Sequence, residues 1–483
     1  MNQYSNLKKI SLISGIILFI VILLIPPPEG METSAWRTAG LGLLMSVFWI
    51  FEPIPIYATA LLPLVISPLF DIISFQEAAR PFSNQIIFLF LGGFFLAVGL
   101  ENTGLHKRFA LKILQILGKS PNSLILGFLL TTSVISSVVN NTSTAMMMLP
   151  IALSIISVLK DSKLLTDNHN ISNFSISILL SIAYGASVGG ITTLIGTAPN
   201  IFMAGFISTT LGLQIQFIDW LYIGIPLLII SNMIIYIVLN KLLFPITGNE
   251  HFDSRIYFKD EYKKLGFWKK EEYIVLIVFL FAVILWIFQP FISKYIKNLN
   301  DGVIAMVCAM LLFLIPVDWQ KGMFILEKKS INKIPWDAIL LFGGGLSIAS
   351  SIEKTKLAEW IGEKLGFISI LPLYFQILLI VTLIIFLTEL TSNIATTAVF
   401  LPILSSIAIN LGENPLLFVI PATISASCAF MLPVATPPNA IVYASGLVKI
   451  SDMTKAGFVL NIFFIFVITI IILFIGIPAL NIK

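Results

Sequence analysis

Two polar clusters interrupt apolar stretches of this chain of 483 residues. Asn-Asn-Thr at 140–142 lies inside the apolar run 121–160, and Ser-Asn-Ile at 392–394 lies inside the run 369–411. Asn and Thr side chains donate hydrogen bonds to carboxylate oxygens and offer their own oxygens to cations, without carrying charge. The sequence contains no pattern of a metal-ligand cluster or a nucleophile triad. The clusters therefore predict the binding of small ions in an apolar environment, and an enzyme is a poor fit.

The two clusters are copies of each other. Asn393 follows Asn141 by 252 residues. The same spacing relates Thr144 and Thr396, Pro150 and Pro402, Gly92 and Gly344, Gly93 and Gly345, Glu101 and Glu353, Thr103 and Thr355, and Leu105 and Leu357. One spacing that holds over so many positions indicates an internal duplication.

Each copy carries a second interruption after the first. Gly-Thr-Ala-Pro-Asn at 196–200 is matched by Ala-Thr-Pro-Pro-Asn at 435–439, at a spacing of 239 residues. Because proline lacks a backbone donor and clashes with the preceding turn, the long helices are expected to unwind here. Unwound carbonyls can coordinate a cation, and helix N-termini attract an anion. The change in spacing predicts a loop between the two interruptions that is 13 residues shorter in the second copy.

None of the four interruptions contains Lys or Arg. A dianion buried among them would need countercharge, because burying an unpaired charge is costly. Cations bound beside it would supply that charge. Ser136, Asn141 and backbone carbonyls would hold one in the first copy, and Thr388, Asn393 and carbonyls another in the second. Oxygen-only ligation suits a hard cation such as Na⁺, so the pattern favours symport.

Composition places the chain in a membrane. Hydrophobic residues make up 57% and charged residues only 11%, whereas soluble domains carry about 25% charged residues. The chain is therefore predicted to cross the lipid bilayer many times. The net charge of +4 does not imply nucleic acid. Cys308 and Cys428 lie in apolar runs and are expected to pack in the core rather than form a disulfide.

The charge distribution predicts the membrane topology. Lys8 and Lys9 precede the first apolar run, and the basic stretch 247–272 separates the two copies, so both are expected in the cytoplasm. The predicted spans and broken runs are 10–26, 37–53, 55–73, 83–104, 121–160, 172–210, 217–244, 273–291, 301–317, 337–353, 369–411, 413–450 and 456–480. Segment 105–119 is too short and too basic to span, and is expected to lie along the cytoplasmic interface.

Two topologies fit these spans. If 121–160 and 369–411 are re-entrant hairpins, about eleven helices cross the membrane and the two copies have inverted topology, a plan common in secondary transporters. If each run is two complete spans, the copies are parallel. The apolar surroundings of the polar clusters favour the hairpins, since irregular backbone at depth must line a cavity. The predicted fold class is an all-α polytopic membrane protein with two re-entrant hairpins and inverted repeats.

From about residue 30 to the C-terminus the chain resembles the divalent anion/sodium symporter family, the INDY-type di- and tricarboxylate transporters. FLFLGGF, TSNIATTAVFLPI and ATPPNAIV carry the resemblance. It implies carboxylate contacts from Asn141, Thr142, Asn393 and Thr436 with Pro437. It also implies two Na⁺ sites, one near Ser136, Asn141 and Gly196 and one near Thr388, Thr391, Asn393 and Ala435. The full candidate substrate set is Asn140, Asn141, Thr142, Ser392, Asn393, Ile394, Thr197, Pro199, Thr436 and Pro437.

The resemblance further implies a homodimer in the plasma membrane, in which a transport domain moves as an elevator against a scaffold domain. The expected division is an N-terminal helix at 1–30, repeat 1 at 31–246, a cytoplasmic linker at 247–272 and repeat 2 at 273–483. Within the repeats, the scaffold comprises 31–80, 213–246, 273–335 and 451–483, and the transport elements comprise 81–212 and 336–450. The arm helices would be the amphipathic segments that follow residues 105 and 356. The N-terminus is then cytoplasmic and the C-terminus extracellular.

Two positions depart from the family pattern. Asn140 stands where the family usually has Ser, and Ile394 stands where it has Thr. The predicted function is Na⁺-coupled symport of C4-type dicarboxylates, the succinate, malate and fumarate class, with no other cofactor. A sodium-independent dicarboxylate exchanger is the main alternative, and a sulfate transporter or an anion channel is less favoured. Glu389 is an acid inside the second hairpin and thus a functional candidate, and it could equally face a cytoplasm-accessible cavity or satisfy hairpin backbone.

Overall fold

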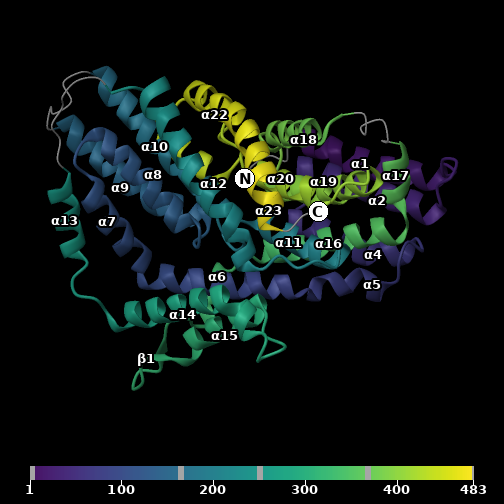
Figure 1. Cartoon of the computed structure of the whole chain (residues 1–483), viewed down its shortest axis with the longest axis horizontal. Helices are drawn as coiled ribbons and strands as arrows, with labels where there is room; N and C mark the ends of the chain where they lie inside the picture. The colour runs from purple at the N-terminus through teal and green to yellow at the C-terminus, as the bar shows by residue number, and fades with distance from the viewer. Residues whose placement is uncertain (1–5, 162–167, 247–253, 365–370, 481–483) are drawn as a thin grey trace.

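A computed structural model describes residues 6–161, 168–246, 254–364 and 371–480. The described chain is mostly helical (Figure 1). Nine helical stretches within it are long and apolar enough to cross a membrane, and five shorter apolar helices accompany them. The expectation of a helical multi-span protein is confirmed at this level.

The first part of the chain runs through helices α1 to α7. Their bounds are α1 Asn6–Leu24, α2 Thr33–Phe51, α3 Ile56–Ala60, α4 Leu62–Leu69, α5 Phe75–Ala79, α6 Gln85–Thr103 and α7 Leu105–Leu117, with a 3-10 turn Arg80–Ser83 before α6. The apolar run predicted over 55–73 is helical from 56 to 69, with an interruption at Leu61 between α3 and α4. Pro63 lies in the first turn of α4, where its missing N–H is tolerated.

The rest of repeat 1 contains the first polar cluster and the first break. Its helices are α8 Pro121–Ser136, α9 Asn141–Asp161, α10 Asn168–Ile191, α11 Ala198–Thr210 and α12 Phe217–Ile237, which continues as a π-helix Val238–Leu243. The predicted linker 247–272 contains a helix of its own, α13 Arg255–Lys264. This helix packs on α7.

Repeat 2 follows the same order. Its helices are α14 Lys270–Ile292, α15 Asp301–Leu314, α16 Trp336–Lys354, α17 Leu357–Lys364, α18 Leu373–Thr388, α19 Asn393–Asn410, α20 Leu416–Ala426, α21 Pro437–Tyr443 and α22 Ile450–Ile471, followed by a π-helix Ile472–Gly476 and α23 Ile477–Ala479. The all-α prediction needs one correction, because β1 Pro316–Asp318 and β2 Met323–Phe324 form an antiparallel pair, followed by a 3-10 turn Lys328–Lys333. The last part of the amphipathic segment expected near 356–367 lies outside the described residues.

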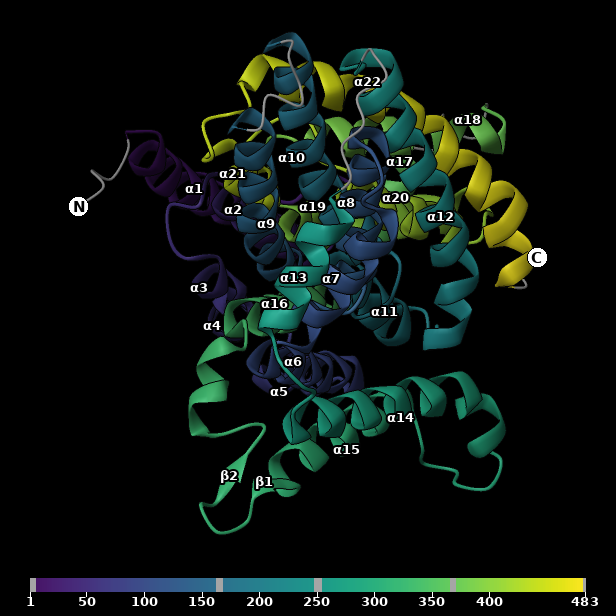
Figure 2. The same ribbon diagram turned by 90° about the vertical axis from the view of Figure 1, so that its left-hand side faces the viewer.

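Equivalent glycines allow each repeat to pack closely on the other. A Cβ on Gly92 of α6 would collide with the backbone of Ala305 in α15, and one on Gly344 of α16 would collide with the backbone of Ala60 in α3. Both glycines therefore permit helix contact at backbone distance, as small residues do in membrane proteins. In both views α14 and α15 lie on one side of α6 and the hairpin helices on the other (Figures 1 and 2).

The shortening of the second copy lies in a helix rather than in a loop. Helix α10 has 24 residues, whereas its counterpart α20 has 11. The prediction of a shorter loop is therefore wrong. Spacing between two motifs reports how many residues separate them, and it does not tell which element lost them.

The broken helices support the polar clusters. Helices α8 and α9 pack on α10, and α18 and α19 pack on α20. The short helices after the breaks cross to the other repeat, so that α21 contacts α9 and α10 while α11 contacts α19 and α20. This exchange brings all four interruptions of the chain together.

Candidate functional site

Each polar cluster lies where one helix ends and the next begins. Helix α8 ends at Ser136 and α9 begins at Asn141, and in the second copy α18 ends at Thr388 and α19 begins at Asn393. The four residues between each pair of helices form the tip of a helical hairpin. The two tips are thus built in the same way from residues 252 positions apart.

A hydroxyl group sits behind each tip among carbonyl oxygens. Ser136 Oγ lies 2.7 Å from Asn141 Oδ1 and 2.8 Å from the carbonyl oxygen of Ala186. Thr388 Oγ1 lies 2.8 Å from Asn393 Oδ1 and 2.8 Å from the carbonyl oxygen of Ala426. One hydroxyl hydrogen can serve only one of two acceptors. Each cluster of three oxygens is therefore suited to a hard cation.

The breaks are held open by buried asparagines. Asn200 Nδ2 donates to the carbonyls of Ile191 and Thr193 at 3.0 and 2.8 Å. Asn439, 239 positions later, donates to the carbonyls of Ala429 and Leu432 at 3.1 and 3.0 Å. These side chains satisfy carbonyls that the unwound chain leaves without helical partners. The asparagines of the two proline motifs therefore hold the break rather than face the cavity.

The prolines sit at the start of helices. Pro199 lies in the first turn of α11, and Pro437 and Pro438 open α21. A proline in this position costs no hydrogen bond, because the first N–H groups of a helix have no partner within it. Thr436 caps α21 by accepting from the N–H of Asn439 at 3.3 Å. The unwinding expected at both motifs is present.

All four interruptions line one cavity of about 520 Å³. Its walls include every residue of the candidate substrate set: Asn140, Asn141, Thr142, Ser392, Asn393, Ile394, Thr197, Pro199, Thr436 and Pro437. Of the candidate cation ligands, Asn141, Gly196, Thr391, Asn393 and Ala435 also line it, while Ser136 and Thr388 are fully buried behind the tips. The volume is within the range of about 300–1,000 Å³ usual for small-molecule sites.

Comparisons with known proteins give the family. The model of the sodium:sulfate symporter transmembrane region matches residues 6–480. The chain belongs to this family. Its members are transporters and not enzymes, so the resemblance to sodium-coupled anion transporters is confirmed.

Relatives within the sodium:sulfate symporter family are similar over their whole length. The chain is 38% identical to the sodium-dependent dicarboxylate transporter SdcS of Staphylococcus saprophyticus, over 100% of this chain and 94% of that protein. It is 36% identical to the protein of the same name from Staphylococcus aureus strain MRSA252, over 98% of this chain and 92% of the other. These matches make the chain a multi-pass membrane protein of the transporter family.

Solved structures of low sequence identity share the fold. The Alcanivorax borkumensis YdaH transporter has a TM-score of 0.58 at 11% identity, covering 97% of this chain and 98% of that one. The MtrF structure from Neisseria gonorrhoeae has a TM-score of 0.55 at 12% identity, covering 97% and 95%. At these identities the likeness concerns the fold alone.

The cavity of this family member contains carboxylates but no basic side chain among its described lining residues. Glu52, at the end of α2, and Asp337, in the first turn of α16, both line it and both are exposed. Glu52 adopts a left-handed conformation with φ 48°, which is uncommon for a residue other than glycine. Positive charge to attract an anion into the cavity must therefore come from backbone dipoles or bound cations.

Glu389 satisfies backbone of the second break. It is 3% exposed, and its carboxylate accepts hydrogen bonds from the N–H groups of Phe430, Met431 and Leu432 at 2.8–3.3 Å. Asn461 Nδ2 of α22 donates a further bond to it at 2.8 Å. Glu389 therefore satisfies backbone, but the backbone is that of the second break and not that of the hairpin. In the first copy the equivalent position is Ser137, whose carbonyl accepts from Thr193 Oγ1.

Each repeat has one buried asparagine in its last long helix that the sequence reasoning missed. Asn232 of α12 accepts from Ser133 Oγ at 2.9 Å, and Asn461 of α22 donates to Glu389. Both lie in long apolar helices and are buried, so their amide groups cannot hydrogen-bond to water. An isolated Asn within a predicted span was the available signal, since buried polar groups in membranes need partners.

Proposed function

We propose that this protein is a secondary transporter of C4-type dicarboxylates such as succinate, malate and fumarate, coupled to Na⁺. Two relatives that match it over almost their full length are named sodium-dependent dicarboxylate transporters. The observation that carries the proposal is the convergence of four helix N-termini on one cavity. Helices α9, α11, α19 and α21 all begin at residues in its wall, or next to one.

Helix N-termini supply the attraction for an anion. A helix N-terminus carries a partial positive charge of about half an elementary charge, which attracts anions. The amides of Asn141 and Asn393 and the hydroxyl groups of Thr142 and Thr436 add neutral donors around the cavity. A dicarboxylate needs such donors at both ends, and the two tips provide them from opposite repeats.

Cations complete the charge balance of the bound dianion. The oxygen clusters at Ser136 and Thr388 adjoin the ends of α8 and α18, where carbonyl dipoles favour positive charge. In our proposal Na⁺ binds there and neutralises part of the substrate charge. Gly196 and Ala435 are candidates to add backbone carbonyls, and Thr391 its hydroxyl group, which also lies 2.6 Å from Thr396 Oγ1.

The transport mechanism that we propose is an elevator. Residues 81–212 and 336–450 contain the cavity-bearing helices that move and the arm helices α7 and α17 that link them to the scaffold, which comprises residues 31–80, 213–246, 273–335 and 451–483. The pairing of α6 with α15 and of α16 with α3 supports inverted repeats that clasp each other. The proposal includes eleven crossing helices, two re-entrant hairpins, a homodimer in the plasma membrane, a cytoplasmic N-terminus and an extracellular C-terminus.

Uptake of labelled succinate into proteoliposomes tests the function. One set of vesicles receives an inward Na⁺ gradient with an empty lumen, and a second set is preloaded with succinate in Na⁺-free buffer. We expect uptake only with the gradient, and protein-free vesicles serve as the control. Uptake only after preloading would identify a sodium-independent exchanger and overturn the coupling.

A second arm of the same experiment tests the substrate. Labelled sulfate is offered to identical vesicles under the Na⁺ gradient, because the family is named for sodium and sulfate. We expect unlabelled succinate to block succinate uptake and sulfate not to accumulate. Sulfate accumulation without succinate uptake would overturn the dicarboxylate assignment.

A further inference from the structure

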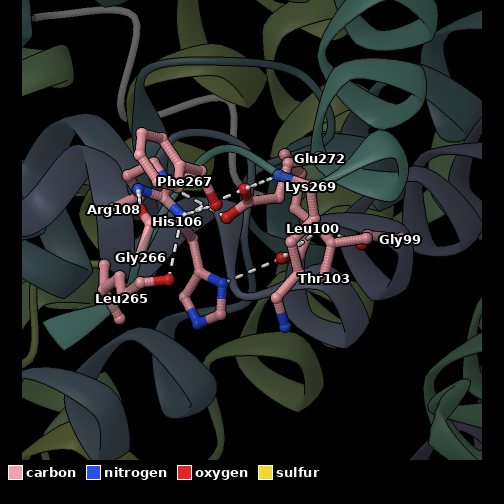
Figure 3. Close-up of polar contacts among 10 residues, drawn as sticks. All are labelled: Gly99, Leu100, Thr103, His106, Arg108, Leu265, Gly266, Phe267, Lys269 and Glu272. Atoms are coloured by element: carbon pink, nitrogen blue, oxygen red, sulfur yellow. Dashed lines mark hydrogen bonds and ion pairs between the residues drawn. The ribbon is translucent and has the colours of Figure 1, made fainter.

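The arm helix α7 carries a buried arginine that is clamped by the segment before α14 (Figure 3). The side chain of Arg108 is only 2% exposed. Its Nε donates to Glu272 Oε1 at 2.9 Å, and its Nη2 donates to Glu272 Oε2 at 3.1 Å. The guanidinium of this basic segment is thus enclosed by protein. A paired geometry of this kind holds the guanidinium in a fixed direction.

Backbone carbonyls and aromatic rings complete the clamp. Arg108 Nη1 donates to the carbonyl of Gly266 at 3.0 Å, and Nη2 lies 3.3 Å from the carbonyl of Phe267. The guanidinium carbon lies 5.3 Å from the ring centroid of Trp268 and 5.4 Å from that of Tyr262. Such a site uses the planar fork of arginine, which lysine cannot reproduce. The contact is thus specific in shape as well as in charge.

The second repeat has an anchor at the equivalent position. Trp360 follows Arg108 by 252 residues and lies on the arm helix α17. Its Nε1 donates to the carbonyl of Glu29 at 3.3 Å. Leu357 of the same helix is buried with Met31 and Ala35. The second arm is therefore held by the segment before α2.

The two anchors are reciprocal. Gly266 lies four residues before the start of α14, and Glu29 lies four residues before the start of α2. Glu272 and Ala35 are each the third residue of those helices. The arm α7 is thus attached to the N-terminal end of α14, and the arm α17 to the N-terminal end of α2. A duplicated contact at matching positions indicates a common role, with a charged anchor in one repeat and an apolar one in the other.

We propose that Arg108 and Glu272 are positioning residues for transport, which keep α7 attached to α13 and to the first turn of α14 while the cavity-bearing helices move. Helix α7 packs on α8, the helix that leads to the first hairpin tip. If α7 stays fixed, α8 and the first hairpin tip can change position relative to it. This inference rests on the proposed transport function, and in particular on its elevator mechanism.

Substitution of Arg108 tests the anchor through uptake kinetics. In proteoliposomes, Arg108→Met is expected to lower the maximal uptake rate about tenfold while the KM for succinate and the Na⁺ dependence change by less than about twofold. Arg108→Lys keeps the charge but not the fork, and is expected to give an intermediate rate. Lys263→Met on α13 is the matched control, because Lys263 pairs with Asp260 in an exposed contact.

The outcomes separate the anchor from the proposed function. No uptake by the unsubstituted protein would overturn the function, whatever the variants do. Uptake by the unsubstituted protein together with full activity of Arg108→Met would overturn the anchor alone. A large change in KM would also overturn it, because it would mean that Arg108 acts on the cavity.

A cross-link tests the anchor while the ion pair between Arg108 and Glu272 stays in place. Lys112 Nζ of α7 lies 5.8 Å from the ring centroid of Tyr262 in α13, so Lys112→Cys with Tyr262→Cys can be joined by a short cleavable thiol reagent. The native Cys308 and Cys428 are buried. We expect the double variant to keep its uptake rate when cross-linked. Failure to cross-link, or loss of uptake that cleavage restores, would contradict an anchor that stays closed.

Discussion

At the scale of single residues, Asn141 and Asn393 hold the central positions of the site. Each begins a helix at a hairpin tip, lines the cavity and contacts a buried hydroxyl group behind it. Hydrogen bonds to charged groups contribute about 1.5–3 kcal/mol each. Asn141→Ala or Asn393→Ala is therefore expected to abolish measurable uptake with normal protein amounts. Asn410→Ala, which removes only a contact to Ser406 near the end of α19, serves as the control. Normal uptake by Asn141→Ala or Asn393→Ala would remove that residue from the site.

Ile394 is the apolar member of the second tip and lines the cavity. Ile394→Thr introduces a hydroxyl donor, and a new hydrogen bond contributes about 0.5–1.5 kcal/mol. We expect the KM values for succinate, malate and 2-oxoglutarate to change by unequal factors. Competition assays in proteoliposomes measure this directly. If all three values stay the same, Ile394 does not contact the substrate.

Glu389 stabilises the second break through a set of donors that all require an acceptor. Glu389→Gln replaces one of the two acceptor oxygens with an NH2 group, which cannot accept a hydrogen bond from a backbone N–H. A buried donor is then left unsatisfied, at a cost of about 1–3 kcal/mol. We expect a lower unfolding temperature of the purified protein in detergent. Glu359→Gln changes an exposed acid of α17 and is expected to leave that temperature unchanged. Equal unfolding temperatures for both variants would contradict the role of Glu389.

At the scale of elements, the close helix packing at the repeated glycines can be tested by comparing a buried glycine with one that has free space around it. Gly344→Ala would force a Cβ into the backbone of Ala60, and overpacking of this kind costs about 1–3 kcal/mol. Gly42→Ala in α2 adds a Cβ where nothing lies within 4 Å. We expect a lower unfolding temperature only for Gly344→Ala. A similar effect of both substitutions would mean that α16 and α3 are not in backbone contact.

Elements were predictable where the sequence pattern is local. The proline motifs predicted the unwound segments, and the polar clusters predicted the hairpin tips, because both depend on what the chain does within a few residues. The interruption at Leu61 and the short α20 were missed, since hydrophobicity alone does not distinguish one helix from two short ones. The burial of Arg108 was missed because its partner Glu272 is 164 residues away.

At the scale of the whole molecule, the spacing of 252 residues predicted that the chain repeats itself, and the motifs predicted its family. The sequence could not tell that α11 and α21 cross to the opposite repeat, which is the step that brings the four interruptions into one cavity. That arrangement depends on tertiary packing between segments from different repeats of the chain. It joins two half-sites that would each be incomplete alone.

The most direct test of the account follows the two ions at once. Labelled succinate and labelled Na⁺ uptake are measured in the same proteoliposomes, with and without the other ion outside. The account predicts that each ion stimulates the uptake of the other, at a constant ratio, and that Asn141→Ala abolishes both stimulations. Succinate uptake at full rate without Na⁺, or Na⁺ entry that succinate does not change, would contradict coupled transport through this cavity.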